Sequence, residues 1–308
     1  MTPKSPHRQV RAGPCSTRFC SLAVLLALGV VSAAALPGRA RAQAAGTVLP
    51  PQTLPVLRAV VAGQAIVQVP ATTATGQRLV IDQQSARAVL DWRSFNIGSG
   101  SEVRFNQPDA TASALNRIYS ADPSLIQGKL SANGQVLLIN QNGILFDRGA
   151  QVNVGALVAS ALNISNDQFM SKSLTAGGNN TPAFQGGYAA DPEVRNGLVD
   201  ITAQVRGAVR VGAGGADGAA VPTLTAAAAG SILLFAPVVE NRNGLIQSPD
   251  GQVILAAGSK VYLSDANPDL QALRGMVVEV SADNGPVDLS SMVRNLGSIS
   301  ADRGNVTL

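Results

Sequence analysis

Histidine and cysteine are almost missing from this sequence of 308 residues. Its one histidine, His7, and its two cysteines, Cys15 and Cys20, all lie within the first 42 residues. The rest of the chain therefore has neither a thiol nor an imidazole, which excludes disulfide bonds, Cys or His metal sites and every nucleophile–histidine relay. Aromatic residues make up only 4% of the chain. A chain poor in aromatics but rich in Gly, Val, Ile and Leu favours thin, repetitive β layers over a bulky globular core.

The first 42 residues are predicted to be a secretory signal peptide. Residues 19–36 form an uncharged apolar run after a basic leader, and an Ala-Arg-Ala cleavage site ends at Ala42. A permanent membrane anchor is the alternative, but the run is at the lower edge of spanning length. Removal of this leader takes six of the 23 Lys and Arg and none of the 19 Asp and Glu, leaving 17 basic against 19 acidic residues. The excess of positive charge is therefore an effect of the leader, and we expect no nucleic-acid partner.

A short phrase, Gly-x-Val-x-Leu, recurs through the rest of the chain. It begins at Gly134, Gly251, Gly285 and Gly304, with a close relative at Gly207, and a second phrase, Gly-x-Ile/Leu, begins at Gly128, Gly244 and Gly297. Val and Leu two residues apart point to the same face of a strand, and glycine allows the corner that starts it. We expect the residue between them to be polar and to face outwards. The spacing of 19 residues between Gly285 and Gly304 falls in the range of ~20 residues at which β-solenoid coils repeat.

These repeats favour a solenoid over a β-sandwich, which also has short strands and frequent turns. Stacked coils would build a continuous core of Val, Ile and Leu layers. Residues 43–58 are Pro-rich and are expected to form an extended lead-in, while residues 165–190 and 212–219 are expected to leave the stack as loops. The sequence ends in mid-phrase at Leu308, so either the protein continues beyond it or the last coil is left open.

Several linked motifs, in order, identify a family. They are Trp92–Gly98, Val103–Pro108, Leu115–Ile118, Pro123–Gly128, Ala132–Gly134, Ile139–Ile144 and Leu157–Ser160. Together they resemble the N-terminal two-partner secretion domain of filamentous haemagglutinin-type exoproteins, most densely over residues 80–165. The resemblance implies an all-β fold over residues 43–308, namely a right-handed parallel β-helix (β-solenoid) with an N-terminal cap and extra-helical hairpins or loops. Residues 190–308 would form further coils.

The resemblance also implies a function. Such a domain addresses a large secreted protein to a partner outer-membrane β-barrel transporter, whose periplasmic domains bind the segment while it is still extended. Members are commonly adhesins, haemagglutinins, cytolysins or contact-dependent toxins, and their activity lies downstream of this domain. A host-cell or carbohydrate ligand would therefore be bound by downstream regions, and the product would be secreted or held at the cell surface.

One motif of the family, Asn-Pro-Asn-Gly-Ile, falls on Asn140-Gln141-Asn142-Gly143-Ile144, with Gln141 in place of proline. The Asn-Pro-Asn-Leu motif that many members carry upstream is missing. Asn142-Gly143 can turn through positive φ, and Asn side chains can bond backbone amides at a coil corner. Two interpretations stay open at this point: residues 140–144 are read directly by the transporter, or they form a turn that defines the fold.

A second group of residues is predicted to serve recognition or the cap. It comprises Trp92, Phe95, Asn96, Asn116 and Arg117. Trp92 and Phe95 are two of the few aromatics, and such residues are more often core plugs at the capped end of a solenoid than a recognition surface. Arg117, with Arg104, could bind an acidic partner, although charges on a strand face usually only keep it hydrated.

Catalysis is not expected, and no cofactor is predicted. Parallel β-helices also house polysaccharide lyases and hydrolases, which need paired carboxylates projecting from adjacent coils. Here the Asp residues lie mainly in turn phrases next to glycine, such as Asp147-Arg-Gly149 and Asp302-Arg-Gly304. The alternatives to a secretion domain are a stand-alone surface β-helix that binds carbohydrate or host protein and, third, a polysaccharide-acting β-helix enzyme.

Overall fold

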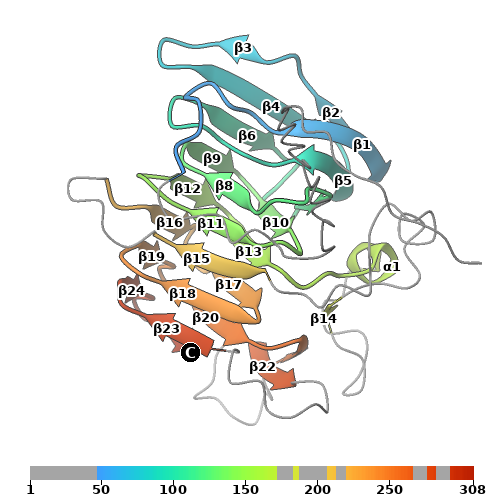
Figure 1. The fold of residues 1–308 in the computed structure, drawn as a ribbon. Coiled ribbons are helices and arrows are strands. Elements are labelled where there is room, and N and C mark those ends of the chain that lie inside the picture. Colours follow the sequence, from blue (N-terminus) through green and yellow to red (C-terminus); the bar gives the residue numbers. More distant parts are fainter. Residues whose placement is uncertain (1–46, 172–182, 187–206, 213–219, 266–275, 282–291) are drawn as a thin grey trace, which may run out of the picture. The chain divides into compact units, whose positions relative to one another are not determined.

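The computed structural model describes residues 47–171, 183–186, 207–212, 220–265, 276–281 and 292–308 (Figure 1). Apart from the short helix α1 (Asn166–Met170), these residues form strands joined by turns. None of the helices in this part of the chain is long and apolar enough to cross a membrane. The predicted signal peptide over residues 1–42 and the predicted loop over 212–219, except for its first residue, lie outside the described residues.

Most strands belong to three sheets, which we call A, B and C (Figure 1). Sheet A consists of β1 (Val56–Ala62), β5 (Arg87–Ser94), β7 (Ser113–Ile118), β10 (Gln135–Ile139), β13 (Ala156–Ser160), β17 (Ser231–Ala236), β20 (Gln252–Ala257) and β25 (Asn305–Thr307). Sheet B consists of β2 (Ala65–Val67), β4 (Gln77–Gln83), β6 (Glu102–Asn106), β9 (Lys129–Ala132), β12 (Gln151–Val154), β16 (Thr223–Ala226), β19 (Leu245–Gln247) and β24 (Ser298–Ser300), with β3 (Ala71–Thr72) paired to β4. Sheet C consists of β8 (Ser124–Ile126), β11 (Ile144–Phe146), β15 (Ala208–Val211), β18 (Val238–Asn241) and β23 (Met292–Asn295).

From β8 onwards, each coil of the chain runs from sheet C through sheet B to sheet A, whereas the two coils before it have strands in sheets B and A only. Strands β8, β9 and β10 make one coil, and β11, β12 and β13 make the next. Neighbouring coils pair in parallel and in register, so that Val136 in β10 lies opposite Leu157 in β13, and Leu130 in β9 lies opposite Val152 in β12. Stacked parallel sheets of this kind form a β-helix, which confirms the predicted fold class and excludes the β-sandwich.

A column of glycines forms the corner between sheets B and A. Its members, Gly134, Gly155, Gly230, Gly251 and Gly304, precede β10, β13, β17, β20 and β25. A Cβ atom at Gly251 would lie 1.8 Å from the carbonyl oxygen of Gly230, and one at Gly304 would lie 1.9 Å from that of Gly251. Only a residue without a side chain lets successive coils approach so closely. Three of the predicted phrases mark this corner, whereas Gly207 starts a strand of sheet C and Gly285 lies outside the described residues.

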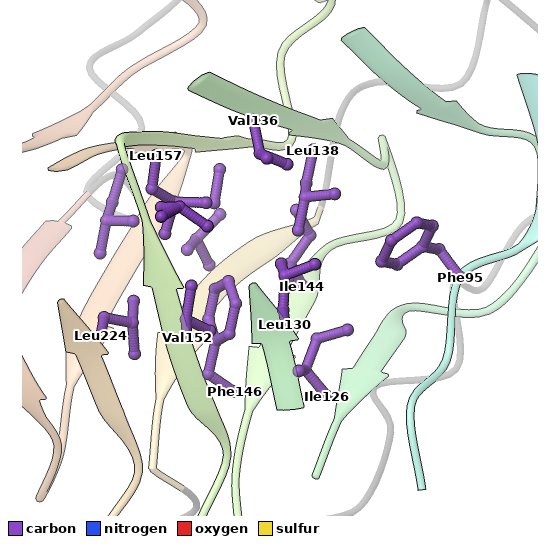
Figure 2. Packing of buried hydrophobic residues seen from close by; sticks show 14 of the residues in the cluster. Phe95, Ile126, Leu130, Val136, Leu138, Ile144, Phe146, Val152, Leu157 and Leu224 are labelled. Carbon is purple, nitrogen blue, oxygen red and sulfur yellow. The ribbon is translucent and has the colours of Figure 1, made fainter. Parts of the chain in front are cut away.

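The interior is filled by inward-facing aliphatic and aromatic side chains from all three sheets. Figure 2 shows several of them, among which Val136, Leu138, Ile144 and Phe146 are at most 1% exposed. Because the strands pair in register, equivalent positions pile up along the stack. One such column of sheet A contains Ala88, Ala114, Val136, Leu157, Ile232 and Val253. These layers supply the apolar burial that no single coil could supply alone.

Sheet A is also buried on its outer face. The residues between Val and Leu of two phrases, Leu137 and Ile254, belong to a second apolar cluster and are 2% and 0% exposed. The prediction that such positions are polar and face solvent is therefore wrong for these two. The physical reason is that segments outside the coils cover this face: Phe169 of α1 and Phe184 lie in the same cluster.

The first coil is capped by antiparallel strands, as the family resemblance implies. Strand β1 pairs antiparallel with β5, and β2 and β3 pair antiparallel with β4. The lead-in before β1 is bonded to the coils: the amide of Gly98 donates to the carbonyl of Thr53 at 2.9 Å, and the side chain of Gln127 donates to the carbonyl of Thr47 at 2.8 Å. The described part of the lead-in therefore lies against the first coils.

A fourth, antiparallel sheet lies outside the coils. It consists of β14 (Phe184–Gln185), β21 (Lys260–Asp265) and β22 (Met276–Ser281). Strand β14 belongs to the insertion between β13 and β15, and the β21–β22 hairpin belongs to the insertion between β20 and β23. These are the extra-helical hairpins expected from the resemblance. Within the predicted loop over residues 165–190, the structure describes α1 and β14.

Candidate functional site

The motif at residues 140–144 forms the corner that joins sheet A to sheet C. Strand β10 ends at Ile139, a four-residue turn follows, and β11 begins at Ile144. The amide of Gly143 donates to the carbonyl of Asn140 at 2.8 Å, which closes the turn, and Gly143 has φ +106°. Glycine is the residue that adopts this conformation without strain. We call this segment the 140–144 corner.

Asn140 stabilises the turn from inside the protein. Its side-chain Oδ1 accepts the amide of Asn142 at 2.9 Å, and its Nδ2 donates to the carbonyl of Asp122 at 3.2 Å and to Oγ of Ser124 at 3.0 Å. The side chain is fully buried. Asn140 therefore shapes its own turn and, at the same time, bonds it to the preceding coil.

The neighbouring coils enclose the rest of the corner. The Nδ2 of Asn142 donates to the carbonyl of Ser120 in the preceding coil at 2.7 Å. On the other side, a Cβ atom at Gly143 would lie 2.6 Å from the carbonyl oxygen of Ala208. Ile144 points into the core (Figure 2) and is 1% exposed. The corner is thus a hydrogen-bonded junction between three coils, and its groups offer hydrogen bonding rather than acid–base chemistry.

Gln141 occupies the second position of this turn, where proline is favoured because its φ is already fixed near the required value. Its side chain is half-buried. We expect Gln141→Pro to be tolerated and to stabilise the domain by about 0.4–1 kcal/mol, because proline restricts the unfolded chain. The urea midpoint of the purified domain measures this, with Gln141→Ala as the control. A loss of stability would mean that the backbone at residue 141 does not match proline.

Trp92 and Phe95 lie in the interior at the capped end of the stack. They are 0% and 1% exposed, and their rings meet edge to face with centroids 5.2 Å apart. The indole Nε1 of Trp92 donates to Oδ1 of Asn116 at 3.0 Å. Asn116 is itself fully buried, and its Nδ2 donates to the carbonyls of Ala114 and Leu137. In the folded domain these residues form a core plug rather than a surface.

Asn96 and Arg117 bond neighbouring segments. Oδ1 of Asn96 accepts the amide of Leu125 at 2.8 Å, one residue after the serine that Asn140 binds. The two asparagines therefore bond successive residues of β8 from opposite sides. The buried guanidinium of Arg117 lies 4.0 Å from the carboxylate of Asp91 and donates to Oδ1 of Asn163 at 3.1 Å. Asn96 is thus linked to the 140–144 corner through β8, whereas Arg117 binds the insertion that follows β13.

A charged cluster on the outer face of sheet C was missed by sequence reasoning. Glu240 in β18 accepts from Arg210 at 2.7 Å and from Arg242 at 3.0 Å, and its side chain is only 7% exposed. Burial raises the pKa of Glu240, but the hydrogen bond from Arg210 and the positive charges of both arginines outweigh it, so the pKa lies below its ordinary value. Arg210 and Glu240 are register partners on adjacent parallel strands, and this pairing joins residues that are 30 positions apart in the sequence.

We expect Glu240→Gln to reduce stability by about 1–2 kcal/mol at neutral pH, because two hydrogen-bonded arginines lose their carboxylate. Since the folded pKa is lowered, the stabilisation is complete above the ordinary glutamate pKa of 4.5 and is lost as the pH falls through the folded value. Urea unfolding at neutral and acidic pH should show the difference from the unaltered domain shrinking in acid. Glu102→Gln, which breaks an exposed pair with Arg78, is the control and should cost less than about 1 kcal/mol.

Among the described residues, no group of three or more His, Cys, Asp or Glu could hold a metal ion. The positive-φ residues Arg148, Asp250 and Arg303 lie in the predicted Asp–Gly turn phrases. The carboxylate of Asp250 is paired with Arg303 at 2.7 Å. These acidic residues therefore serve the turns of the coils.

Comparison with known proteins identifies the family. A model described as the TPS secretion domain matches residues 58–305. The heme/hemopexin-binding protein of Haemophilus influenzae strain Rd is 42% identical over 111 residues, which are 36% of this chain and 12% of that protein. A second H. influenzae protein of the same name is 44% identical over 90 residues, or 29% of this chain and 10% of that protein. The matches thus span only a small part of these curated relatives.

Among solved structures, the crystal structure of the HMW1 secretion domain from Haemophilus influenzae is similar to this one with a TM-score of 0.60 and 27% sequence identity. The match covers 81% of this chain and 55% of that chain. The stacked parallel sheets, the antiparallel cap and the family match over residues 58–305 agree. The chain belongs to the TPS secretion domain family and is the secretion domain of a two-partner secreted exoprotein.

Proposed function

We propose that this domain is read by a partner outer-membrane β-barrel transporter while it is still extended, and that it folds into its β-helix outside the cell. The precursor begins with a cleaved signal peptide at residues 1–42, which directs export through the inner membrane. The mature domain extends from residue 43 through the coils and carries a downstream adhesin- or haemagglutinin-like region. Membership of the TPS family supports the transporter as the partner.

The burial of the 140–144 corner is the observation that carries this proposal. Asn140 is 0% exposed and Ile144 is 1% exposed in the folded domain. The amide groups of Asn140 and Asn142 are already bonded within the stack. A partner that reads these side chains must therefore meet them before the coils form. In the extended chain, the same five residues present three free side-chain amides and a β-branched side chain.

Strand addition is the recognition mode that suits an extended chain. The transporter's periplasmic domains would pair with its main-chain groups first, and pockets for alternate side chains would add specificity. The segments that later pair within the β-helix, such as β10 and β11, flank the motif directly. Folding outside the cell would then replace these temporary pairings by coil-on-coil pairings, which helps to prevent backsliding.

The test is secretion of residues 1–308 in cells with and without the transporter. We expect the domain in the medium only when the transporter is present. Equal amounts in both media would remove the proposal.

A substitution in the motif sharpens this test. We expect Asn142→Asp to reduce export. A carboxylate cannot donate to the carbonyl of Ser120 that Asn142 binds, so the folded domain should lose about 1–3 kcal/mol of stability. Asn153→Asp is the matched control, since Asn153 is exposed on the outer face of sheet B. The amount of each variant in the medium, normalised to its cellular level, is the measurement. Unchanged export of Asn142→Asp would show that the 140–144 corner contributes neither to recognition nor to folding.

A further inference from the structure

The outer face of sheet A carries an apolar ladder that runs through six successive strands. Its members are register partners: Val89, Leu115, Leu137, Val158, Leu233 and Ile254. Each is at most 6% exposed. The covering groups come from outside the coils: Phe169 of α1, Phe184 of β14, and Val261 and Leu263 of β21 belong to the same cluster. We call residues 163–170 together with β14 and β21 the strap.

The first part of the strap lies against coils that precede it in the chain. It follows β13, yet the guanidinium of Arg87 in β5 donates to the carbonyl of Phe169 and lies 5.2 Å from the centre of its ring. In β7, Arg117 donates to Oδ1 of Asn163 at 3.1 Å and to the carbonyl of Ile164 at 2.8 Å. In sheet A, β10 and β7 lie between β13 and β5. The strap therefore reaches back across two strands to the capped end.

The second part of the strap joins the two insertions. Asn163 and Gln185 exchange backbone hydrogen bonds of 2.8 and 3.0 Å. Gln185 is in turn the antiparallel partner of Lys260 in β21. The ring of Phe184 packs against that of Phe235 in β17, with centroids 5.3 Å apart. A continuous set of contacts thus leads from Arg117 in β7 to β21, which follows β20.

We propose that this strap couples the capped end of the stack to the coils of β17 and β20, so that these early and late coils unfold as one unit. In an unstrapped solenoid each repeat contacts only its neighbours, and either end can open without the other. The strap contacts β5 and β7 on one side and β17 on the other. Opening β5 and β7 alone would break their bonds to the strap and expose the outer ladder that it covers.

The strap also has a consequence for export, which rests on the proposed function. Its segments lie later in the sequence than the coils that they bind. If the N-terminus emerges first, β5 and β7 receive their bonds to Asn163, Ile164 and Phe169 only after residue 170 has left the transporter. The link from there to β21 forms only after residue 261 is outside, so the early coils are coupled to the late coils only at that stage.

Hydrogen exchange of the folded domain in increasing urea tests the coupling. We expect the amides of β5 and β7 to exchange at the same rate, and with the same urea dependence, as those of β17 and β20. Phe184 packs against Phe235 of β17, and we expect Phe184→Ala to uncouple the early coils from the late coils, so that β5 and β7 exchange at least about tenfold faster than β17 and β20. If Phe184→Ala does not fold, Arg87→Met takes its place. This substitution removes the hydrogen bond between β5 and the carbonyl of Phe169, and we expect it to have the same effect on exchange.

Leu224→Ala is the matched control, because Leu224 is fully buried in sheet B and is remote from the strap cluster. It should speed exchange at both ends alike. The proposal is overturned if the two ends exchange independently in the unaltered domain, or if the strap variants leave them matched. This experiment needs no transporter, so its failure would leave the export proposal standing, and a failed secretion test would leave the strap standing.

Discussion

Gly143→Val is expected to prevent the domain from folding and to abolish its appearance in the medium. Gly143 has φ +106°, which a β-branched residue does not adopt without strain. Its Cβ would also lie 2.6 Å from the carbonyl oxygen and 2.9 Å from the amide nitrogen of Ala208, both of which are backbone atoms and cannot rotate away. The backbone strain and the atomic overlap together should lower the free energy of unfolding by more than about 3 kcal/mol.

Urea titration followed by far-UV circular dichroism tests this: we expect the Gly143→Val domain to lack the cooperative unfolding transition of the unaltered domain. Gln141→Ala is the matched control, because it changes the same turn at a half-buried side chain and should shift stability by less than about 1 kcal/mol. A Gly143→Val domain with a normal unfolding midpoint would show that the coil corner is not packed as described.

Trp92→Ala is expected to destabilise the capped end by about 3–5 kcal/mol, since it leaves a large cavity in the core. The side chain is 0% exposed, lies edge to face with Phe95 and donates to Asn116. Trp92→Phe should cost less, because most of the packing remains. It still leaves Oδ1 of the buried Asn116 without its donor, which should reduce the stability of the domain by about 1–3 kcal/mol.

A double variant separates packing from hydrogen bonding at this plug. Asn116 lies in register between Leu90 and Leu138 on the inner face of sheet A. Adding Asn116→Leu to Trp92→Phe should therefore recover part of the loss, because the unpaired oxygen is replaced by a side chain that suits the column. Circular dichroism is the measurement, since Trp92 is the chain's only tryptophan. A double variant less stable than Trp92→Phe alone would contradict this role of Asn116.

The coil corners could be predicted from the sequence because their cause is local. Gly134 and Gly251 start strands of sheet A, and Gly128 and Gly244 start strands of sheet B. Each of these four phrases thus marks one corner of a coil, and its alternating apolar residues mark the inner face of the next strand. The turn at Asn142-Gly143 was predictable for the same reason.

The outer face of sheet A could not be predicted because its cover comes from far away in the sequence. Leu137 and Ile254 lie opposite segments around Phe169 and Val261 that leave the coils. One signal was present: the unbroken apolar run over residues 136–139 is typical of strands buried on both faces. Likewise, the bonding partners of the 140–144 corner come from neighbouring coils, and the sequence alone does not reveal coil register.

The most direct test of the whole account is to titrate the transporter's periplasmic domains against the mature domain in two states. One sample is kept unfolded by fresh dilution from urea, and the other is fully refolded. Because Asn140 and Ile144 are buried once the coils form, we predict binding to the unfolded chain and at least about tenfold weaker binding to the folded one. Equal or tighter binding of the folded domain would contradict the account.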